Sequence, residues 1–269
     1  MNLTGFLTPN FDKARRIFLK MEQYKDKVAV VTGASSGIGA LIVVRFLEAG
    51  MKVVGLARRK EKVEELCDGY TGRLFAIKTD LTKKEEILSA FKWTTENVGP
   101  VHVLINNAGI ICNKTIFDAD VDHWQKLLDT NLLALAITTK EAIRIMKSEG
   151  ITGSIININS IAGHYYLNMP GTTIYQASKF GVTAFTELTR LELAKEGTRI
   201  RISSISPGLV DTEMIFKYKN ESEVEHNQYV KETPILEGEH IANAVVYVLS
   251  NPLEVQVTDL IIRPLGELL

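Results

Sequence analysis

Cysteine and histidine are scarce in this sequence. Its 269 residues include two cysteines, Cys67 and Cys112, and five scattered histidines. Two distant cysteines and isolated histidines lack the ligand spacing of a metal site, so we expect no catalytic metal. A chain of this length with 45% hydrophobic residues can build a core without a disulfide, which favours a reducing, cytoplasmic compartment.

Long apolar runs and an excess of either charge are also absent from the sequence. No run approaches the roughly 20 apolar residues that a membrane-spanning helix needs, and the N-terminus lacks the pattern of a secretory signal. Lysine and arginine number 31 against 32 aspartates and glutamates, so no overall positive charge attracts nucleic acid or an anionic membrane. The expected partners are small molecules or other copies of this chain.

The first 24 residues stand apart from the rest of the pattern. Basic and apolar residues alternate between positions 11 and 20, but Asp12 is unusual for a transit peptide. A dispensable extension and a targeting address are both compatible with this segment, and its separation from the regular pattern favours the extension. The sequence therefore predicts an N-terminal extension at 1–24 ahead of a single domain at 25–269.

Short β-branched runs alternate with longer amphipathic stretches along the remaining chain. This alternation is typical of a parallel sheet with helices on both faces. Right-handed crossovers then favour one α/β domain with a Rossmann-like, doubly wound, seven-stranded parallel sheet. The predicted strands are 28–31, 53–56, 74–77, 101–105, 154–158, 201–205 and 255–262, and the predicted helices are 40–49, 61–67, 85–98, 121–146, 174–194 and 240–249.

Residues 212–234 interrupt this rhythm. They are polar and charged, and they end at Pro234. A segment of this length beyond a strand end commonly serves as a mobile lid over a ligand site. We therefore expect a lid at about 212–234.

A glycine-rich turn follows the first predicted strand and opens directly into a helix. Gly33 permits a tight turn, Gly37 allows the backbone to approach a pyrophosphate, and Gly39 lets helix and strand pack closely. The N–H groups at the start of the helix then face negative charge. An ordinary loop is the alternative, but the position inside a βαβ unit favours a dinucleotide site. The expected cofactor-binding residues of this turn are Gly33, Ser35, Ser36, Gly37, Ile38 and Gly39.

Two arginines end the second predicted strand, where an NAD-binding protein would place an acidic residue for the ribose 2′-hydroxyl. Arg58 and Arg59 suit a 2′-phosphate instead, because guanidinium groups bind phosphate through paired, charge-assisted hydrogen bonds. The alternative is that both arginines belong to a solvated helix start. The sequence thus favours NADP(H) as the cofactor.

Small and amide residues follow the third and fourth predicted strands. Asp80 and Leu81 come after the third, and Asn107, Ala108 and Gly109 come after the fourth. These positions lie at the carboxyl edge of the sheet, where this fold binds ligands, so we expect them to contact the adenine and its ribose. Taken singly, the aspartate could be a helix cap and the Asn-Ala-Gly segment an ordinary turn.

A phenol and an ammonium group are placed four residues apart at a predicted helix start. Tyr175 and Lys179 therefore share one helix face. A tyrosine ionises at a pKa of about 10, and a nearby cation favours the phenolate that proton transfer requires. The pair is a candidate for general acid/base catalysis, and both residues also belong to the expected cofactor site.

Ser160 and Asn131 are the other candidate catalytic residues. Ser160 ends the fifth predicted strand and could donate a hydrogen bond to a substrate oxygen as charge develops there. Asn131 lies inside the predicted helix 121–146, an unfavourable place for an amide. It is either a buried polar group bonded to the backbone or the anchor of a water that links Lys179 to solvent.

Together these motifs resemble the classical short-chain dehydrogenase/reductase family. The resemblance extends from about Lys25 to Pro264. It implies that Tyr175 is the general acid/base, that Lys179 binds the ribose and tunes the phenol, and that Ser160 orients a carbonyl. It also implies that the nicotinamide carboxamide is held just after Pro207 and Gly208, by Val210 and Thr212. The motifs are Thr-Gly-x-x-x-Gly-x-Gly at 32–39, Asn-Asn-Ala-Gly at 106–109, the Asn131, Ser160, Tyr175 and Lys179 set, and Ser-Pro-Gly at 206–208.

Three segments resemble the farnesol-dehydrogenase-like insect branch of this family and its steroid-active vertebrate relatives. They are residues 54–59, 155–160 and 257–264. The resemblance implies a hydrophobic alcohol or ketone as substrate, either an isoprenoid such as farnesol or a steroid or ecdysteroid such as 3-dehydroecdysone. The run 164–170 is either an apolar pocket wall or packing under the lid.

The leading hypothesis is therefore an NADP(H)-dependent oxidoreductase that interconverts a hydrophobic alcohol and its carbonyl compound. A broad-specificity carbonyl reductase for detoxification is the alternative within the same chemistry. A non-catalytic NADP(H)-binding sensor is the alternative of another class, although retention of Ser160, Tyr175 and Lys179 argues against it. Apolar residues on the predicted helices 121–146 and 174–194 favour a homodimer or homotetramer.

Overall fold

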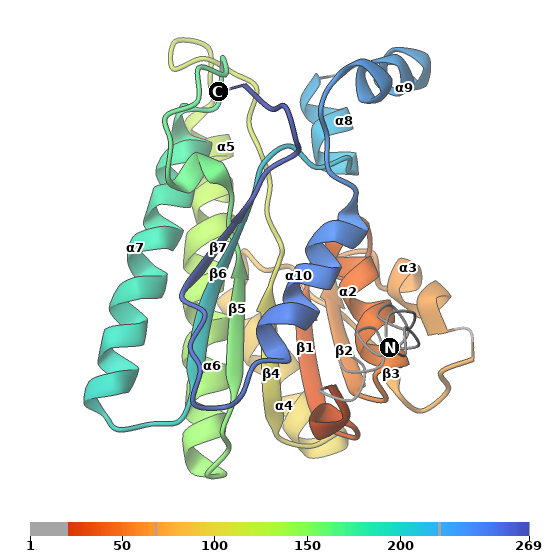
Figure 1. Cartoon of the computed structure of the whole chain (residues 1–269), viewed down its shortest axis with the longest axis vertical. Helices are drawn as coiled ribbons and strands as arrows, with labels where there is room; N and C mark the ends of the chain where they lie inside the picture. The colour runs from red at the N-terminus through yellow and green to blue at the C-terminus, as the bar shows by residue number, and fades with distance from the viewer. Residues whose placement is uncertain (1–20, 68, 220–221, 269) are drawn as a thin grey trace, which may run out of the picture.

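Seven parallel strands form one sheet in the order β3-β2-β1-β4-β5-β6-β7 (Figure 1). The structure is a computed structural model that describes residues 21–67, 69–219 and 222–268. The sheet confirms the predicted Rossmann-like, single-domain α/β fold. Every residue of β1 is buried, as expected for a parallel strand covered on both faces. The strands are β1 Val28–Thr32, β2 Lys52–Ala57, β3 Leu74–Lys78, β4 Val101–Asn106, β5 Ser154–Ile158, β6 Arg201–Pro207 and β7 Asp259–Ile262.

Helices cover both faces of the sheet. On one face lie α2 (Gly37–Glu48), α3 (Lys60–Glu64) and α10 (Gly238–Leu249), which share one apolar core with alternate strand residues such as Val31. On the other face, α4 (Lys84–Asn97), α6 (Ala134–Ser148) and α7 (Thr173–Lys195) share a second core with the intervening strand residues, such as Val30. The alternation of β1 between the two cores is the period-2 pattern of a strand. Short 3-10 turns occur at Glu22–Tyr24, Glu65–Cys67 and Ile161–Gly163.

Two predicted elements differ from those observed. The predicted helix 121–146 is divided into α5 (Val121–Leu128) and α6 by a π-helical turn at Asp129–Leu133. The predicted last strand begins at Asp259 rather than at Val255. Before that point the Val255 carbonyl accepts a hydrogen bond from the Arg201 guanidinium of β6 at 3.2 Å, instead of taking part in backbone pairing between strands.

The predicted lid contains two helices, α8 (Glu213–Lys219) and α9 (Glu223–Glu232). Ser222 and Glu225 form a capping box at the start of α9. Both helices lie beyond the carboxyl ends of the strands (Figure 1). The described part of this segment is thus largely helical, and its role as a lid remains a prediction.

The core of the domain includes residues ahead of the predicted boundary at residue 25. Residues 1–20 of the expected extension lie outside the described residues, whereas Met21 and Tyr24 are buried in the core beside α2 and α10. The Tyr24 hydroxyl donates to the Leu249 carbonyl at 3.3 Å and accepts from Arg201 at 3.0 Å. Across the described residues, every helix is too short or too polar to cross a bilayer.

Candidate active site

Hydrogen bonds join the start of the glycine-rich turn to the segment that follows β4. The Thr32 hydroxyl accepts hydrogen bonds from the backbone N–H groups of Asn107 and Ala108, at 3.0 and 3.1 Å. In return, the Asn107 side chain donates to the Thr32 carbonyl at 3.0 Å. Gly33 has a φ of 66° and lies so close to this segment that an added Cβ would be 2.9 Å from the Ala108 Cα. The glycine is therefore required both for its backbone conformation and for this close approach.

We expect Gly39→Ala to destabilise the protein by about 1–3 kcal/mol and to weaken dinucleotide binding about tenfold. A Cβ at Gly39 would collide with the Gly33 carbonyl and approach the Asn107 amide nitrogen to 2.5 Å, and neither group can move without opening the turn. Thermal unfolding and NADPH titration measure the two effects. Gly181→Ala in α7 is the control, because the atoms nearest to its added Cβ belong to the flexible end of the Leu132 side chain. Equal effects of both variants would contradict this account.

The two arginines after β2 have different neighbours. Arg59 donates to the Ser36 hydroxyl of the glycine-rich turn at 3.0 Å and pairs with Glu213 at 3.1 Å. Arg58 is exposed, and its charge acts on Asp80 at the end of β3. Burial works to raise the pKa of Asp80, but hydrogen bonds from Thr82 and the charge of Arg58 outweigh it and lower the pKa. Both arginines therefore border the edge where the glycine-rich turn lies.

Ser160, Tyr175 and Lys179 come together at the carboxyl end of β5. The Ser160 hydroxyl accepts a hydrogen bond from the Ala162 N–H at 3.1 Å and lies near the Tyr175 phenol, where it acts to lower the pKa of that phenol. Lys179 lies one helical turn beyond Tyr175, with Nζ 5.8 Å from the centre of the phenol ring. The same Nζ donates to the Ile158 carbonyl at 3.0 Å, which fixes the ammonium beside the strand end.

Burial dominates the ionisation of both groups on α7. It raises the pKa of Tyr175, and the Ser160 hydroxyl only partly opposes that rise. It lowers the pKa of Lys179 to about 8. From the sequence, the lysine is expected to favour the phenolate, but burial has the larger influence on the pKa of Tyr175 in the protein without cofactor. Near neutral pH the phenol is therefore protonated and the lysine is charged, so Tyr175 is ready to donate a proton.

Asn131 lies in the π-helical turn between α5 and α6. Its amide oxygen accepts from the Ile110 N–H at 2.8 Å, and its amide nitrogen donates to the Ile110 carbonyl at 2.9 Å. The same nitrogen donates to the Ser178 hydroxyl at 3.2 Å, next to Lys179 on α7. The first interpretation, a buried amide bonded to the backbone, describes these contacts. The water link to Lys179 stays a prediction.

The segment after β6 lies beside the glycine-rich turn. Gly208, following Pro207, donates its N–H to the Ile262 carbonyl at 2.7 Å, which ties this turn to β7. Val210 is buried, whereas Thr212 reaches across to α2, where a Cβ on Gly37 would lie 3.4 Å from its methyl group. The two ends of the predicted cofactor site, the pyrophosphate turn and the nicotinamide segment, therefore lie side by side.

Comparisons with known proteins agree with this arrangement. A family model described as short chain dehydrogenase matches residues 27–223. The chain belongs to the short-chain dehydrogenase/reductase family. It is accordingly an oxidoreductase of a family that binds a nicotinamide cofactor.

Several relatives of this short-chain dehydrogenase/reductase are similar over nearly their whole length. Farnesol dehydrogenase from Aedes aegypti is 44% identical over 252 residues, covering 92% of this chain and 99% of the relative. Dehydrogenase/reductase SDR family member 11 from Homo sapiens is 40% identical over 250 residues, covering 91% and 96%. Among solved structures, the closed form of serine dehydrogenase complexed with NADP+ has a TM-score of 0.82 at 29% identity, covering 90% of this chain and 96% of that one.

The residues at the carboxyl edge of this short-chain dehydrogenase/reductase fit a nicotinamide dinucleotide. Gly33 and Gly37 have positive φ values and carry no Cβ, so the backbone of the turn stays accessible at the N-terminus of the 12-residue helix α2. The turn could hold the pyrophosphate, and Asp80 with residues 107–109 could hold the adenosine. No group of three or more potential metal ligands occurs among the described residues.

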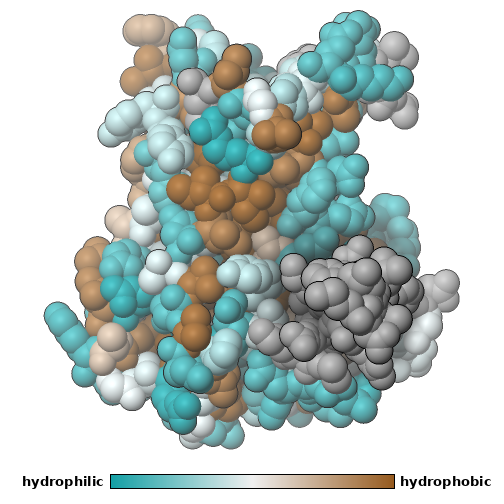
Figure 2. Space-filling model, in the orientation of Figure 1, coloured by the Kyte–Doolittle hydropathy of each residue, from teal (hydrophilic) through white to brown (hydrophobic). Residues whose placement is uncertain are grey.

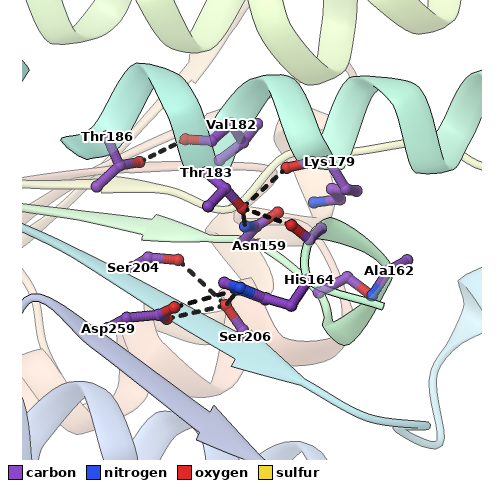
Figure 3. A network of polar contacts seen from close by, with 12 residues as sticks. Asn159, Ala162, His164, Lys179, Val182, Thr183, Thr186, Ser204, Ser206 and Asp259 are labelled. Carbon is purple, nitrogen blue, oxygen red and sulfur yellow. Dashed lines mark hydrogen bonds and ion pairs between the residues drawn. The ribbon is translucent and has the colours of Figure 1, made fainter. Parts of the chain in front are cut away.

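The segment after Ser160 is bonded through His164 to strands β6 and β7 at one edge of the sheet. His164 Nε2 lies 2.8 Å from the Ser206 hydroxyl and 3.2 Å from an Asp259 carboxylate oxygen, and Figure 3 shows the imidazole directed at these two residues. Tyr166 is 90% exposed and stacks on Phe180 of α7. His164 thus packs against β6 and β7, whereas Tyr166 is largely exposed, and whether residues 164–170 form a pocket wall stays a prediction.

A buried polar network behind the candidate catalytic residues of this short-chain dehydrogenase/reductase was not predicted from the sequence. The Asn106 amide nitrogen donates to the Asn157 side-chain oxygen and to the Thr139 hydroxyl, each at 2.9 Å, and the Asn157 amide donates to Thr186 of α7 at 2.9 Å. The network connects β4 and β5 with α6 and α7. Its sequence signal is an asparagine in each of two largely apolar strands, because its partners are distant in the sequence.

Proposed function

We propose that this protein is an NADP(H)-dependent oxidoreductase that interconverts a hydrophobic alcohol and its ketone or aldehyde by hydride transfer. The observation that carries the proposal is the grouping of Ser160, Tyr175 and the buried Lys179 at the carboxyl end of β5, with the Lys179 Nζ 5.8 Å from the centre of the phenol ring, at the same edge of the sheet as the glycine-rich turn. A binding protein has no need of a phenol beside a serine and a buried ammonium. This argues against the NADP(H)-sensor alternative.

Tyr175 serves as the general acid/base in this proposal, and Asn131, Ser160 and Lys179 support it. The bound NADPH supplies the hydride for the carbonyl carbon. Ser160 donates a hydrogen bond to the carbonyl oxygen and stabilises the charge that develops there. Tyr175, whose pKa is raised by burial, donates its proton to that oxygen, and the Lys179 ammonium stabilises the phenolate left behind. Asn131 holds the neighbouring α7 in place through Ser178.

The preference for NADP(H) rests on the two arginines after β2. Guanidinium groups at this position favour a 2′-phosphate, and the serine dehydrogenase with a similar fold was solved with NADP+. Val210 and Thr212 then receive the nicotinamide carboxamide, following Pro207 and Gly208.

We expect Arg58→Ala/Arg59→Ala to weaken NADPH binding by about 10- to 100-fold while leaving NADH binding almost unchanged, because only NADPH carries the phosphate. Titration of both nucleotides against the purified variant measures the two affinities. Lys60→Ala/Lys62→Ala, in the adjoining helix α3, is the control for the general loss of two positive charges. An unchanged ratio of NADPH to NADH affinity would contradict the cofactor assignment.

The proposed substrate is an isoprenoid such as farnesol, or a steroid or ecdysteroid such as 3-dehydroecdysone. The similarity to a farnesol dehydrogenase supports a hydrophobic alcohol or carbonyl compound. The test is oxidation of NADPH by the purified protein with farnesal, steroid ketones, 3-dehydroecdysone and small dicarbonyl compounds. One preferred hydrophobic substrate supports the proposal. Weak turnover of every carbonyl favours the detoxifying reductase, and no turnover with NADPH still bound favours the sensor.

We further propose a homodimer or homotetramer in the cytoplasm. Large apolar side chains are exposed on α7, at Leu188 and Leu191, and at the sheet edge, at Ile261 of β7 and at Val255 just before it. Figure 2 shows a hydrophobic surface over β7. Burial of both surfaces against other copies of the chain would account for this exposure.

The segment 212–234 is proposed as a lid of the single domain, whose core includes Met21 and Tyr24 ahead of the predicted start at 25. Its first helix already contacts two loops at the carboxyl edge of the sheet. The Tyr218 hydroxyl donates to the Pro170 carbonyl at 2.8 Å, and the Tyr218 carbonyl accepts from the Asn113 amide at 3.0 Å. Closure on substrate would therefore involve α8 together with the loops at 107–120 and 164–172.

A further inference from the structure

Arg59 is shared between the glycine-rich turn and the lid. Its Nη2 donates to the Ser36 hydroxyl at 3.0 Å and to the Glu213 carboxylate at 3.1 Å, and Nη1 lies 3.5 Å from the second carboxylate oxygen. Glu213 is the first residue of α8, 154 positions further along the chain. One guanidinium thus faces a residue of the cofactor turn and the first residue of a lid helix.

The start of α8 lies directly against the cofactor edge. The Thr212 methyl group lies 3.4 Å from the position of a Cβ on Gly37, and the Met214 methyl group lies 3.7 Å from that of a Cβ on Gly109. Glu213 stands between these two contacts in the sequence. A change in the Arg59–Glu213 pair therefore acts on residues that border both the glycine-rich turn and the end of β4.

A 2′-phosphate would compete with Glu213 for Arg59. The phosphate monoester carries about −1.5 to −2 charges at neutral pH and offers three acceptor oxygens, whereas the carboxylate carries a single charge. The present pair is weak because both side chains are well exposed, at 43% for Arg59 and 46% for Glu213. Once phosphate occupies the guanidinium, the carboxylate beside it is repelled by like charge.

We propose that Glu213 is a cofactor-specificity residue that competes with the 2′-phosphate for Arg59, so that phosphate binding releases the start of α8. The inference rests on the proposed NADP(H) preference. Glu213 thereby lowers the affinity for phosphorylated cofactor, and α8 responds to the 2′-phosphate independently of the nicotinamide. A nucleotide without that phosphate leaves the pair intact.

Isothermal titration of Glu213→Gln with adenosine 2′,5′-bisphosphate and with AMP tests the competition. These probes differ only in the 2′-phosphate and contain no nicotinamide. The variant should bind the bisphosphate about two- to tenfold more tightly than the native protein and bind AMP unchanged, which also verifies the fold. Glu64→Gln is the matched control. The Glu64 carboxylate is exposed to a similar extent as that of Glu213, and it pairs with Lys60 at 3.1 Å rather than with Arg59. Equal bisphosphate affinity of Glu213→Gln and the native protein overturns the inference.

A double variant separates competition from simple repulsion. In an Arg59→Ala background, Glu213→Gln should improve bisphosphate binding much less than it does in the native protein. An equal improvement in both backgrounds overturns competition for Arg59. If the native protein binds bisphosphate no better than AMP, both the cofactor preference and this inference fail. If that preference holds but Glu213→Gln has no effect, only the inference fails.

Hydrogen exchange reports on the coupling to the lid. In the native protein the backbone amides of α8, from Met214 to Tyr218, should exchange faster with bisphosphate than with AMP. In Glu213→Gln they should exchange fast with either probe, because the pair is already broken. Exchange in α8 that does not distinguish the two probes in the native protein overturns the release of the lid helix.

Discussion

Tyr175→Phe is expected to lower kcat for carbonyl reduction by about 10²–10⁴-fold, since removal of the hydroxyl leaves no group to protonate the substrate oxygen. Ser160 would remain as a hydrogen-bond donor but is a far weaker acid. The phenol ring and its packing persist in the variant, so the affinity for NADPH should change by less than about threefold. Steady-state kinetics and NADPH titration on the same preparation measure both quantities.

The matched control for this variant is Tyr247→Phe, which removes a hydroxyl from an exposed tyrosine of α10. It should leave kcat unchanged. Near-normal turnover by Tyr175→Phe with cofactor bound would remove the phenol from the mechanism, and the acid would have to be sought elsewhere at the carboxyl edge.

Lys179→Met should act in opposite directions on activity and stability. It should lower kcat by about 10²-fold or more, because the phenolate loses its neighbouring cation. In the protein without cofactor it should raise the melting temperature by a few degrees. Burial lowers the pKa of Lys179 from 10.5 to about 8, and keeping this ammonium charged at neutral pH costs about 3 kcal/mol. Loss of the hydrogen bond to the Ile158 carbonyl offsets part of the gain.

The pH dependence of this stability difference follows from the direction of the shift. The unfolded chain binds the lysine proton more tightly than the folded protein, so the native protein gains stability as pH rises from about 8 to 10.5. The advantage of Lys179→Met should therefore be largest below pH 8 and shrink toward pH 10.5. Lys195→Met, at the exposed end of the same helix, should show no such dependence. A variant less stable than the native protein at neutral pH would contradict the destabilising burial of Lys179.

The elements that depend on local pattern were predictable from the sequence. The buried strand β1 is a run of β-branched residues interrupted by Ala29, and the glycine-rich turn lies where the strand ends and the helix begins. Tyr175 and Lys179 are brought together by helical periodicity alone, because both lie on α7. Ser160 could be placed beside them because parallel strands end at one edge of the sheet.

Other features depend on contacts between distant segments and gave no such signal. The π-helical turn around Asn131 is held by the Ile110 backbone, and the helical periodicity of 121–146 does not reveal it. The pairing of Arg59 with Glu213 and the anchoring of His164 to Asp259 join residues about 100 or more positions apart. Burial also reversed the expected direction of the Tyr175 pKa, since the environment of a side chain is a property of the folded protein.

The most direct test of the central claim is hydride transfer from isotopically labelled cofactor. NADPH carrying deuterium at both C4 positions of its nicotinamide ring is incubated with the protein and farnesal, or with the best carbonyl compound from the substrate panel. We expect the alcohol product to gain one deuterium, detected by mass spectrometry, and Tyr175→Phe to form almost none of this product. An alcohol without deuterium, or no alcohol from any carbonyl compound while NADPH is bound, would contradict the claim.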